Sequence, residues 1–218
     1  MSCKNFLFDL DGTLTDPADG ITNALKHAQE KMGMPVSTRE ELLKFIGPPL
    51  LPMFQSEWGL TLDQSRQALL GYREYYADTG VFENEVYPGI PHMLAALNKA
   101  GARVFIASSK PELYCEKIAE HFRLSGYFEA ICGSLMNETR TKKEEVIAYA
   151  LEHFGLKKEE TLMIGDREHD VKGAQLNGLA CAGVLFGYGS REELSGAGAC
   201  ALLASPAELE AYLLKAAE

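Results

Sequence analysis

The chain has 218 residues, 46% of them hydrophobic, and 31 acidic against 21 basic residues give it a formal net charge of −10. A chain of this length can bury one good core and still supply a smaller second domain. Its acidic balance, without a long basic run, argues against polymeric nucleic acid as a partner, and there is no apolar run of about 18 residues to span a membrane.

The amino-terminal region and the cysteines favour a cytoplasmic protein. Asp9 and Asp11 interrupt the first apolar stretch, so a signal peptide is not expected. The five cysteines are scattered and have no Cys-x-x-Cys spacing, which predicts neither a disulfide framework nor a zinc site. We expect all of them to be small buried hydrophobic residues: Cys3, Cys115, Cys132, Cys181 and Cys200.

The first predicted element is a buried strand over residues 6–8, with Asp9 at its end and Asp11 in the turn that Gly12 allows. Ligands bind at the ends of such strands in α/β proteins. Two carboxylates beside an apolar strand cost free energy unless they are paired or bind a metal, so the pattern indicates a site. The alternative is an acidic hairpin loop.

Residues 16–85 have a helical pattern without a strand candidate. The second predicted helix is opened by a capping box of Thr38 and Glu41. The spacing of apolar residues predicts helices over residues 20–31, 38–45, 50–58 and 62–77.

From Tyr87 onward, strand and helix patterns alternate, which predicts a parallel, doubly wound sheet. The predicted strands are 103–107, 130–132, 161–165 and 180–185, and residues 187–198 are expected to form a flexible loop. We therefore expect an α/β fold in which residues 1–15 and 86–218 form the core domain. Residues 16–85 are expected to form an inserted all-helical domain.

Two serines, Ser108 and Ser109, follow the predicted strand 103–107 and precede a predicted helix over residues 112–121. The hydroxyl of Ser108 and the backbone N–H groups around Ser109 could hold a phosphate oxygen. Serines before a helix commonly serve only as helix caps, and that interpretation stays open.

A second acidic pair, Asp166 and Asp170, follows the predicted strand 161–165. Mg²⁺ prefers oxygen ligands and keeps several waters, so it needs few carboxylates, placed on different strands. Carboxylates at different strand ends, here Asp9, Asp166 and Asp170, could therefore share such an ion. Alternatively, Asp166 and Asp170 are acids that the dipole of the following helix favours.

Together these segments resemble the motifs of the haloacid dehalogenase superfamily, in order and over nearly the whole chain. Asp9-Leu-Asp11-Gly-Thr resembles the first motif, Ser108 the second and Gly-Asp166-x-x-x-Asp170 the fourth. Ser109 stands where many relatives have asparagine.

The third motif of that superfamily is a lysine, which supplies positive charge opposite the carboxylates. Lys143 is preferred over Lys142, because its spacing to Glu145 and to the following Val-Ile resembles the phosphoglycolate phosphatase and nucleotidase-like branch. Without the other motifs, a lysine at a helix start is normally a solvated surface residue.

The resemblance further implies a Rossmann-like core with residues 16–85 as a helical cap. Such a cap hinges near residues 16–17 and 84–87, excludes water and contacts the leaving group. Gly47 in the turn 46–49 and Arg73 are the expected substrate contacts in the cap, together with Ser109 in the core. The simpler interpretations are a helix-breaking turn and a surface arginine.

The implied activity is that of a Mg²⁺-dependent phosphatase with an aspartyl-phosphate on Asp9. The resemblance implies that Asp9, Asp166 and the backbone carbonyl of Asp11 are the metal ligands, with Asp170 acting through water or orienting the others. In that mechanism Lys143 neutralises charge, Ser108 holds phosphoryl oxygens, and Asp11 gives a proton to the leaving oxygen and takes one from water. The expected partner is a small phosphorylated metabolite, either a nucleoside 5'-monophosphate or phosphoglycolate, with phosphoglycolate as the family-level label. We expect a monomer or weak homodimer without membrane association.

Three alternatives remain open. A sugar phosphomutase of the same fold would use the same residues and give isomerised product without free phosphate. A non-catalytic binding module would be inert toward phosphomonoesters, although it has no need of Asp9, Asp11, Lys143, Asp166 and Asp170 together. A true dehalogenase would need no Mg²⁺.

Overall fold

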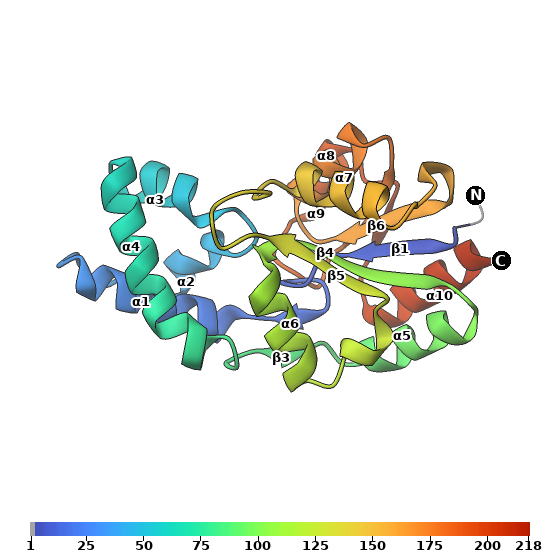
Figure 1. Cartoon of the computed structure of the whole chain (residues 1–218), viewed down its shortest axis with the longest axis horizontal. Helices are drawn as coiled ribbons and strands as arrows, with labels where there is room; N and C mark the ends of the chain where they lie inside the picture. Colours follow the sequence, from blue (N-terminus) through green and yellow to red (C-terminus); the bar gives the residue numbers. More distant parts are fainter. Residues whose placement is uncertain (1–2) are drawn as a thin grey trace. The chain divides into compact units, whose positions relative to one another are not determined.

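The structure is a computed structural model that describes residues 3–218 (Figure 1). The chain divides into two compact units, of which the first comprises Met1–Asp16 and Val86–Glu218 and the second Pro17–Glu85. Residues 1 and 2 of the expected core domain lie outside the described residues.

A six-stranded parallel sheet forms the centre of the first unit, with the order β5-β4-β1-β6-β7-β8. The central strand β1 is buried along its whole length, and its Phe8 lies opposite Ile106 of β4 and Ile164 of β6. Strands covered by helices on both faces are continuously apolar, which is why these segments lack the alternation of a half-exposed strand. The strands are β1 (Asn5–Phe8), β4 (Arg103–Pro111), β5 (Ala130–Ser134), β6 (Thr161–Gly165), β7 (Ala180–Val184) and β8 (Ala201–Leu203).

Helices cover both faces of this sheet, as Figure 1 shows. One layer consists of α7 (Lys143–His153), α8 (Glu168–Leu176) and α9 (Arg191–Ala197), and the other of α5 (Ile90–Lys99), α6 (Glu112–His121) and α10 (Pro206–Ala217). Short 3₁₀ turns, η3 (Ser125–Tyr127) and η4 (Lys158–Glu160), precede β5 and β6. One core cluster lies between the sheet and helices α7 and α8, where Val146, Ile147 and Val171 are fully buried. The predicted doubly wound α/β fold is confirmed.

The second unit is helical, as predicted for the insertion. Its helix α1 packs along α4, where Gly71 permits close approach: an added Cβ would lie 3.3 Å from the Cα of Ala28. The predicted capping box is present, because the Glu41 N–H donates to the Thr38 hydroxyl and the Glu41 carboxylate accepts from the Thr38 N–H. The elements are α1 (Ala18–Lys31), α2 (Arg39–Leu42), η1 (Leu43–Phe45), α3 (Leu50–Trp58), α4 (Leu62–Tyr75) and the π-helical turn η2 (Tyr76–Gly80).

Two short strands, β2 (Thr15–Asp16) and β3 (Glu85–Val86), pair with each other where the backbone passes between the two units. The helical pattern of residues 16–85 gave no sign of them, because two residues are too few for a periodicity. Within residues 3–218, each helix is too short or too polar to span a bilayer.

Three expectations about local structure are wrong. The segment 187–198 is not a loop throughout, because it contains α9, whose start is capped when the Ser190 hydroxyl accepts from the Glu193 N–H. The predicted helix over residues 38–45 ends at Leu42 and continues only as a 3₁₀ turn. Cys200 is exposed, while the other four cysteines are buried, and all five are free thiols.

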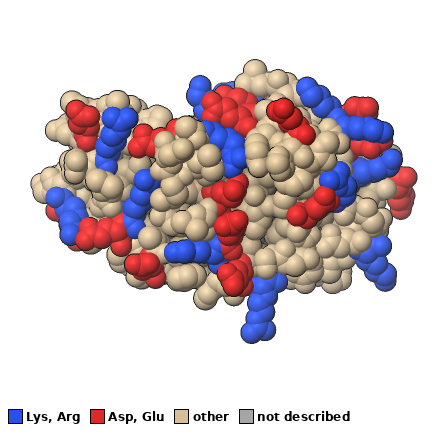
Figure 2. Space-filling model, in the orientation of Figure 1, with Lys and Arg blue, Asp and Glu red and all other residues tan. Residues whose placement is uncertain are grey.

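Charged side chains are intermixed on the surface. On the face drawn in Figure 2, Lys and Arg side chains lie among Asp and Glu side chains over the described residues.

Candidate active site

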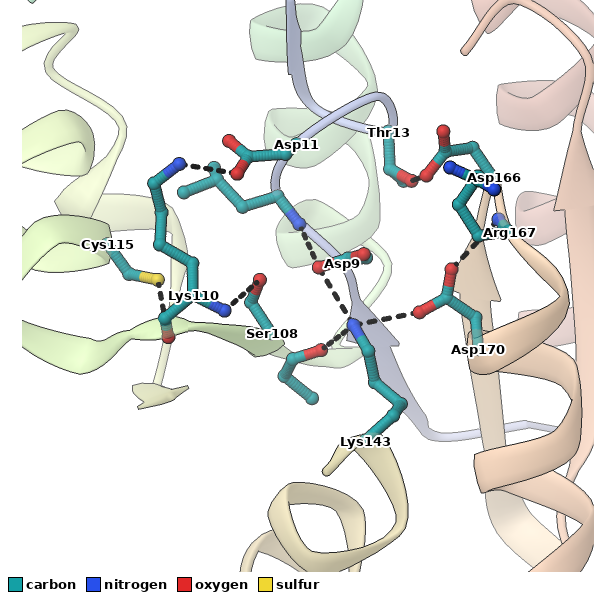
Figure 3. A network of polar contacts seen from close by, with 12 residues as sticks. Asp9, Asp11, Thr13, Ser108, Lys110, Cys115, Lys143, Asp166, Arg167 and Asp170 are labelled. Carbon is teal, nitrogen blue, oxygen red and sulfur yellow. Dashed lines mark hydrogen bonds and ion pairs between the residues drawn. The ribbon is translucent and has the colours of Figure 1, made fainter. Parts of the chain in front are cut away.

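Three carboxylates from distant parts of the chain meet at the carboxyl ends of two strands. Asp9 follows β1, Asp166 follows β6, and Asp170 lies in the first turn of α8. One carboxylate oxygen of each lies within 4.8 Å of those of the other two, and all three residues are buried. Because β1 and β6 are parallel neighbours in the sheet, their ends bring these side chains together (Figure 3).

Lys143, the first residue of α7, lies among these carboxylates. Its Nζ is 2.8 Å from Asp9 Oδ1 and 2.8 Å from Asp170 Oδ1, and it donates to the carbonyl oxygen of Ala107 at 3.0 Å. Burial alone would lower the pKa of Lys143, but the charges of Asp170 and Asp9 outweigh it and raise the pKa above its usual value. The ammonium group therefore stays charged. Lys142, the alternative candidate, is exposed.

The carboxylate of Asp170 contacts both the start of α8 and Lys143. Its Oδ2 accepts from the Arg167 backbone N–H at 3.0 Å, at the start of α8, and its Oδ1 faces Lys143. Burial raises the pKa of Asp170 to about 6, and Lys143 opposes that shift. One oxygen of Asp170 therefore accepts a hydrogen bond at the helix start, as the helix-dipole alternative predicts. The other oxygen contacts Lys143 in the site.

The carboxylate of Asp166 accepts hydrogen bonds from one residue before it and one residue after it in the chain. The Tyr188 N–H donates to its Oδ2 at 2.8 Å, and the Thr13 hydroxyl donates to its Oδ1 at 3.4 Å. Burial raises the pKa of Asp166 well above its usual value, and the charges of Asp170 and Asp9 add to the shift. A buried carboxylate beside two others is a site that gains stability from a cation.

The carboxylate of Asp11 points away from this cluster, toward Lys110 (Figure 3). Lys110 forms a buried ion pair with Asp11 Oδ2, whereas Oδ1 is buried and makes no hydrogen bond with the described residues. Burial raises the pKa of Asp11, and Lys110 opposes the rise. The sequence reasoning missed Lys110, although its place directly after the two serines of the strand end was a usable signal.

Ser108 does not cap the following helix. The cap position of α6 is Pro111, without a side-chain hydrogen bond, whereas the buried Ser108 hydroxyl accepts from the Lys110 N–H at 3.3 Å. The helix-cap interpretation is therefore wrong for this serine. Ser109 is half-buried on the same strand.

The two candidates in the helical insertion belong to the second unit. Gly47 has a φ of 102°, a conformation that suits the turn after η1, and Arg73 is half-buried on α4. Their contact with a substrate stays a prediction.

The carboxylate cluster fits Mg²⁺. Of its three buried carboxylates, those of Asp9 and Asp170 contact the Lys143 ammonium, so the cluster keeps an excess of negative charge that a divalent ion would balance. All the donors are hard oxygen atoms, with no cysteine or histidine among them, which is the ligand type that Mg²⁺ prefers.

The chain belongs to the family described as haloacid dehalogenase-like hydrolase, whose profile matches residues 6–184. A solved structure described as a predicted phosphatase from Clostridium acetobutylicum has a TM-score of 0.96 and 42% sequence identity, and the match covers 99% of this chain and 100% of that one.

Three curated relatives illustrate the range of names among the proteins similar to this chain. A 5'-nucleotidase of Pseudomonas aeruginosa is 46% identical over 190 residues, covering 87% of this chain and 86% of that protein. The tyrosine-protein kinase PtkA of Mycobacterium tuberculosis is 37% identical over 183 residues, which cover 84% of this chain but 62% of that protein. A phosphoglycolate phosphatase of Aquifex aeolicus is 30% identical over 183 residues, covering 84% of each chain. Within this family the chain is a phosphoric monoester hydrolase.

Proposed function

We propose that this chain hydrolyses a small phosphomonoester with the help of Mg²⁺, and that Asp9 is the nucleophile. The observation that carries the proposal is the position of Asp9, whose carboxylate contacts the Lys143 ammonium at 2.8 Å and shares a cluster with Asp166 and Asp170. A nucleophilic carboxylate needs such positive charge nearby, because it must approach a phosphoryl group that is itself negative.

The contacts of Asp9 leave one oxygen for the reaction. Its Oδ1 accepts from the Leu10 N–H at 2.8 Å and faces Lys143, which fixes the orientation of the carboxylate. We therefore assign the attack on phosphorus to Oδ2. The new bond to Asp9 forms as the bond to the leaving oxygen breaks, which gives an aspartyl-phosphate.

Asp9 and Asp166 would hold the metal together with the backbone carbonyl of Asp11, and Asp170 would orient Lys143 and the start of α8. Bound Mg²⁺ would neutralise charge on the phosphoryl oxygens and so favour attack by a carboxylate. Lys143 would supply a fixed positive charge next to Asp9, and Ser108, within β4, would donate a hydrogen bond from its hydroxyl group to a phosphoryl oxygen.

Asp11 would move the protons. Its burial raises its pKa, so that at neutral pH it holds a proton more readily than an exposed aspartic acid does. It would give this proton to the leaving oxygen and then, as a carboxylate, take one from the water that hydrolyses the aspartyl-phosphate.

For the substrate we propose a nucleoside 5'-monophosphate first, because the relative named 5'-nucleotidase is 46% identical over most of both chains. Phosphoglycolate is the second candidate and is supported by the relative of that name at 30% identity. The helical second unit would serve as the cap that excludes water and selects the leaving group, with Gly47 and Arg73 as its candidate contacts.

We further propose that the protein works in a reducing compartment, the cytoplasm, as a monomer or weak homodimer. All five cysteines are free, and four of them are buried, which suits a compartment in which thiols stay reduced. Sedimentation equilibrium over a range of concentrations measures the oligomeric state.

The test is a panel of phosphorylated metabolites assayed for free phosphate with Mg²⁺ and ranked by kcat/KM. Asp9→Asn should abolish the release, while Asp63→Asn, a matched change at an α4 side chain that is 96% exposed, should leave it unchanged. Release of free phosphate distinguishes hydrolysis from a phosphomutase reaction, which returns the phosphoryl group to the substrate and gives an isomerised product. Near wild-type turnover by Asp9→Asn would refute the assignment of the nucleophile.

A further inference from the structure

Residues 186–189, here called the strap, lie against Asp166 and have no part in the chemistry described above. The backbone N–H of Tyr188 donates to Asp166 Oδ2 at 2.8 Å. The carboxyl group that receives this bond is 1% exposed, so the hydrogen bond is shielded from water.

The two glycines of the strap stand where a side chain cannot fit. A Cβ on Gly187 would lie 2.2 Å from the carbonyl oxygen of Gly12 and 2.5 Å from the Cβ of Asp166. A Cβ on Gly189 would lie 1.9 Å from the carbonyl oxygen of Asp166. Neither glycine has a positive φ, so close approach to Asp166, and not backbone conformation, requires glycine here.

The side chains of Tyr188 and Phe186 attach the strap to neighbouring segments. The Tyr188 hydroxyl donates to the carboxylate of Asp16, the last residue of β2. The ring of Phe186 packs edge-on against the ring of Tyr87, the residue that directly follows β3. The two ring centroids are 5.1 Å apart. The strap is thus fixed to the two segments where the backbone passes between the units, and its N–H is held in place.

We infer that the strap is a positioning element for the metal: it orients the Asp166 carboxylate so that its oxygens face the cluster with Asp9. This inference rests on the proposed Mg²⁺ site. A ligating carboxylate that is free to rotate loses affinity for its ion, because binding must then also fix the rotation, and groups that orient ligands typically contribute about 10- to 100-fold in metal affinity.

The first experiment measures Mg²⁺ binding to Gly187→Ala by isothermal titration calorimetry, without substrate. The added methyl group displaces the strap or Asp166, and we expect Mg²⁺ affinity to fall by about 10- to 100-fold. Gly196→Ala is the matched control, because a Cβ at this α9 position meets nothing within 4 Å. Circular dichroism establishes that each variant is folded.

The second variant, Tyr188→Phe, keeps the N–H group and the ring and removes only the hydroxyl contact with Asp16. We expect weaker Mg²⁺ binding and a higher KM for Mg²⁺, with kcat near that of the wild type at saturating Mg²⁺. A merely structural role would lower the melting temperature without this change in the KM for Mg²⁺. If Gly187→Ala does not fold, the Mg²⁺ affinity and the KM for Mg²⁺ of Tyr188→Phe test the inference.

Wild-type Mg²⁺ affinity in every folded strap variant would overturn the inference and leave the proposed function intact. A wild-type protein that neither binds Mg²⁺ nor depends on it for phosphate release would overturn both. The two failures are therefore distinguishable by the wild-type titration alone.

Discussion

At the scale of single residues, Asp9 and Asp11 differ in their partners although they are separated by one position. Asp9 lies within reach of Lys143 and the carboxylate cluster, whereas Asp11 pairs with Lys110 and keeps one buried oxygen without a hydrogen bond to a described residue. Two carboxyl groups in different environments can take different chemical roles. This difference is the basis for proposing that Asp9 is the nucleophile and Asp11 a separate proton donor.

The role of Asp11 predicts a dependence on the leaving group. Asp11→Asn should lower kcat/KM for an alkyl phosphate by about 10²- to 10⁴-fold, because an alkoxide needs a proton to depart. It should affect p-nitrophenyl phosphate much less, since p-nitrophenolate departs without one. Steady-state kinetics with both substrates measure the difference, and kcat/KM reports only the steps through phosphorylation of Asp9. Equal losses for both substrates would contradict the assignment of Asp11 as the acid.

Lys143 predicts a combined loss of activity and stability. Lys143→Met should lower kcat by about 10²- to 10³-fold through the loss of a fixed charge at the phosphoryl group. Its removal also leaves the buried carboxylates of Asp9 and Asp170 without their cation, which should cost about 3–5 kcal/mol of unfolding free energy in the absence of Mg²⁺. Activity assays and urea unfolding measure the two effects. Lys142→Met, at the exposed neighbouring lysine, should change neither.

At the scale of secondary-structure elements, the site depends on where strands end and helices begin. Asp9 and Asp166 directly follow β1 and β6, Ser108 lies in the last part of β4, and α7 begins with Lys143 itself. Parallel strands place these ends at one edge of the sheet, so residues far apart in sequence converge without long loops. Changes that shift a strand end by one residue should therefore affect catalysis more than stability.

The contact that joins β4 to the segment before β5 predicts a pH-dependent stability. Arg103, at the start of β4, donates twice to the Glu129 carboxylate, at 2.7 and 2.6 Å. This hydrogen bonding lowers the pKa of Glu129 below its usual value. A carboxyl group whose pKa is lower when folded adds stability above its unfolded pKa and loses that contribution as the pH falls through its folded pKa.

Glu129→Gln should therefore lower the unfolding free energy at pH 7 by at most about 1 kcal/mol, because the pair is largely exposed. The difference between wild type and variant should shrink as the pH falls toward 3. Urea unfolding at several pH values measures it, with the exposed Glu116→Gln as the control. A difference that grows on acidification would contradict the attribution to this pair.

At the scale of the whole molecule, folding buries three carboxylates in one cluster, so a divalent cation bound there should stabilise the fold. A ligand that binds only the folded state adds about 2.7 kcal/mol at a concentration 100 times its Kd. Mg²⁺ should raise the melting temperature of the wild type, and EDTA should reverse the rise and abolish activity. Asp166→Asn should melt at the same temperature with and without Mg²⁺. Differential scanning calorimetry measures these melting temperatures. Full activity in EDTA would contradict the proposed role of Mg²⁺.

Most of the fold was predictable because its signals are local. The apolar runs before Asp9, Ser108 and Asp166 define strands by composition alone, and the capping box at Thr38 defines a helix start. The predictions failed where local signals were weak. Helix α9 lies in a segment with several glycines, and β2 and β3 are formed by pairing with each other rather than by their composition.

The sequence by itself determined the alternation of helices with the sheet strands from β1 through β7, the parallel sheet and the acidic residues that follow its strands, because each of these follows from a short segment and its period. Only the tertiary structure decided which charges meet. Lys110 reaches Asp11 across 99 positions, and Tyr188 reaches Asp166 across 22. Such contacts depend on the register of the sheet and on backbones that approach closely at glycine, and no local pattern encodes either of these.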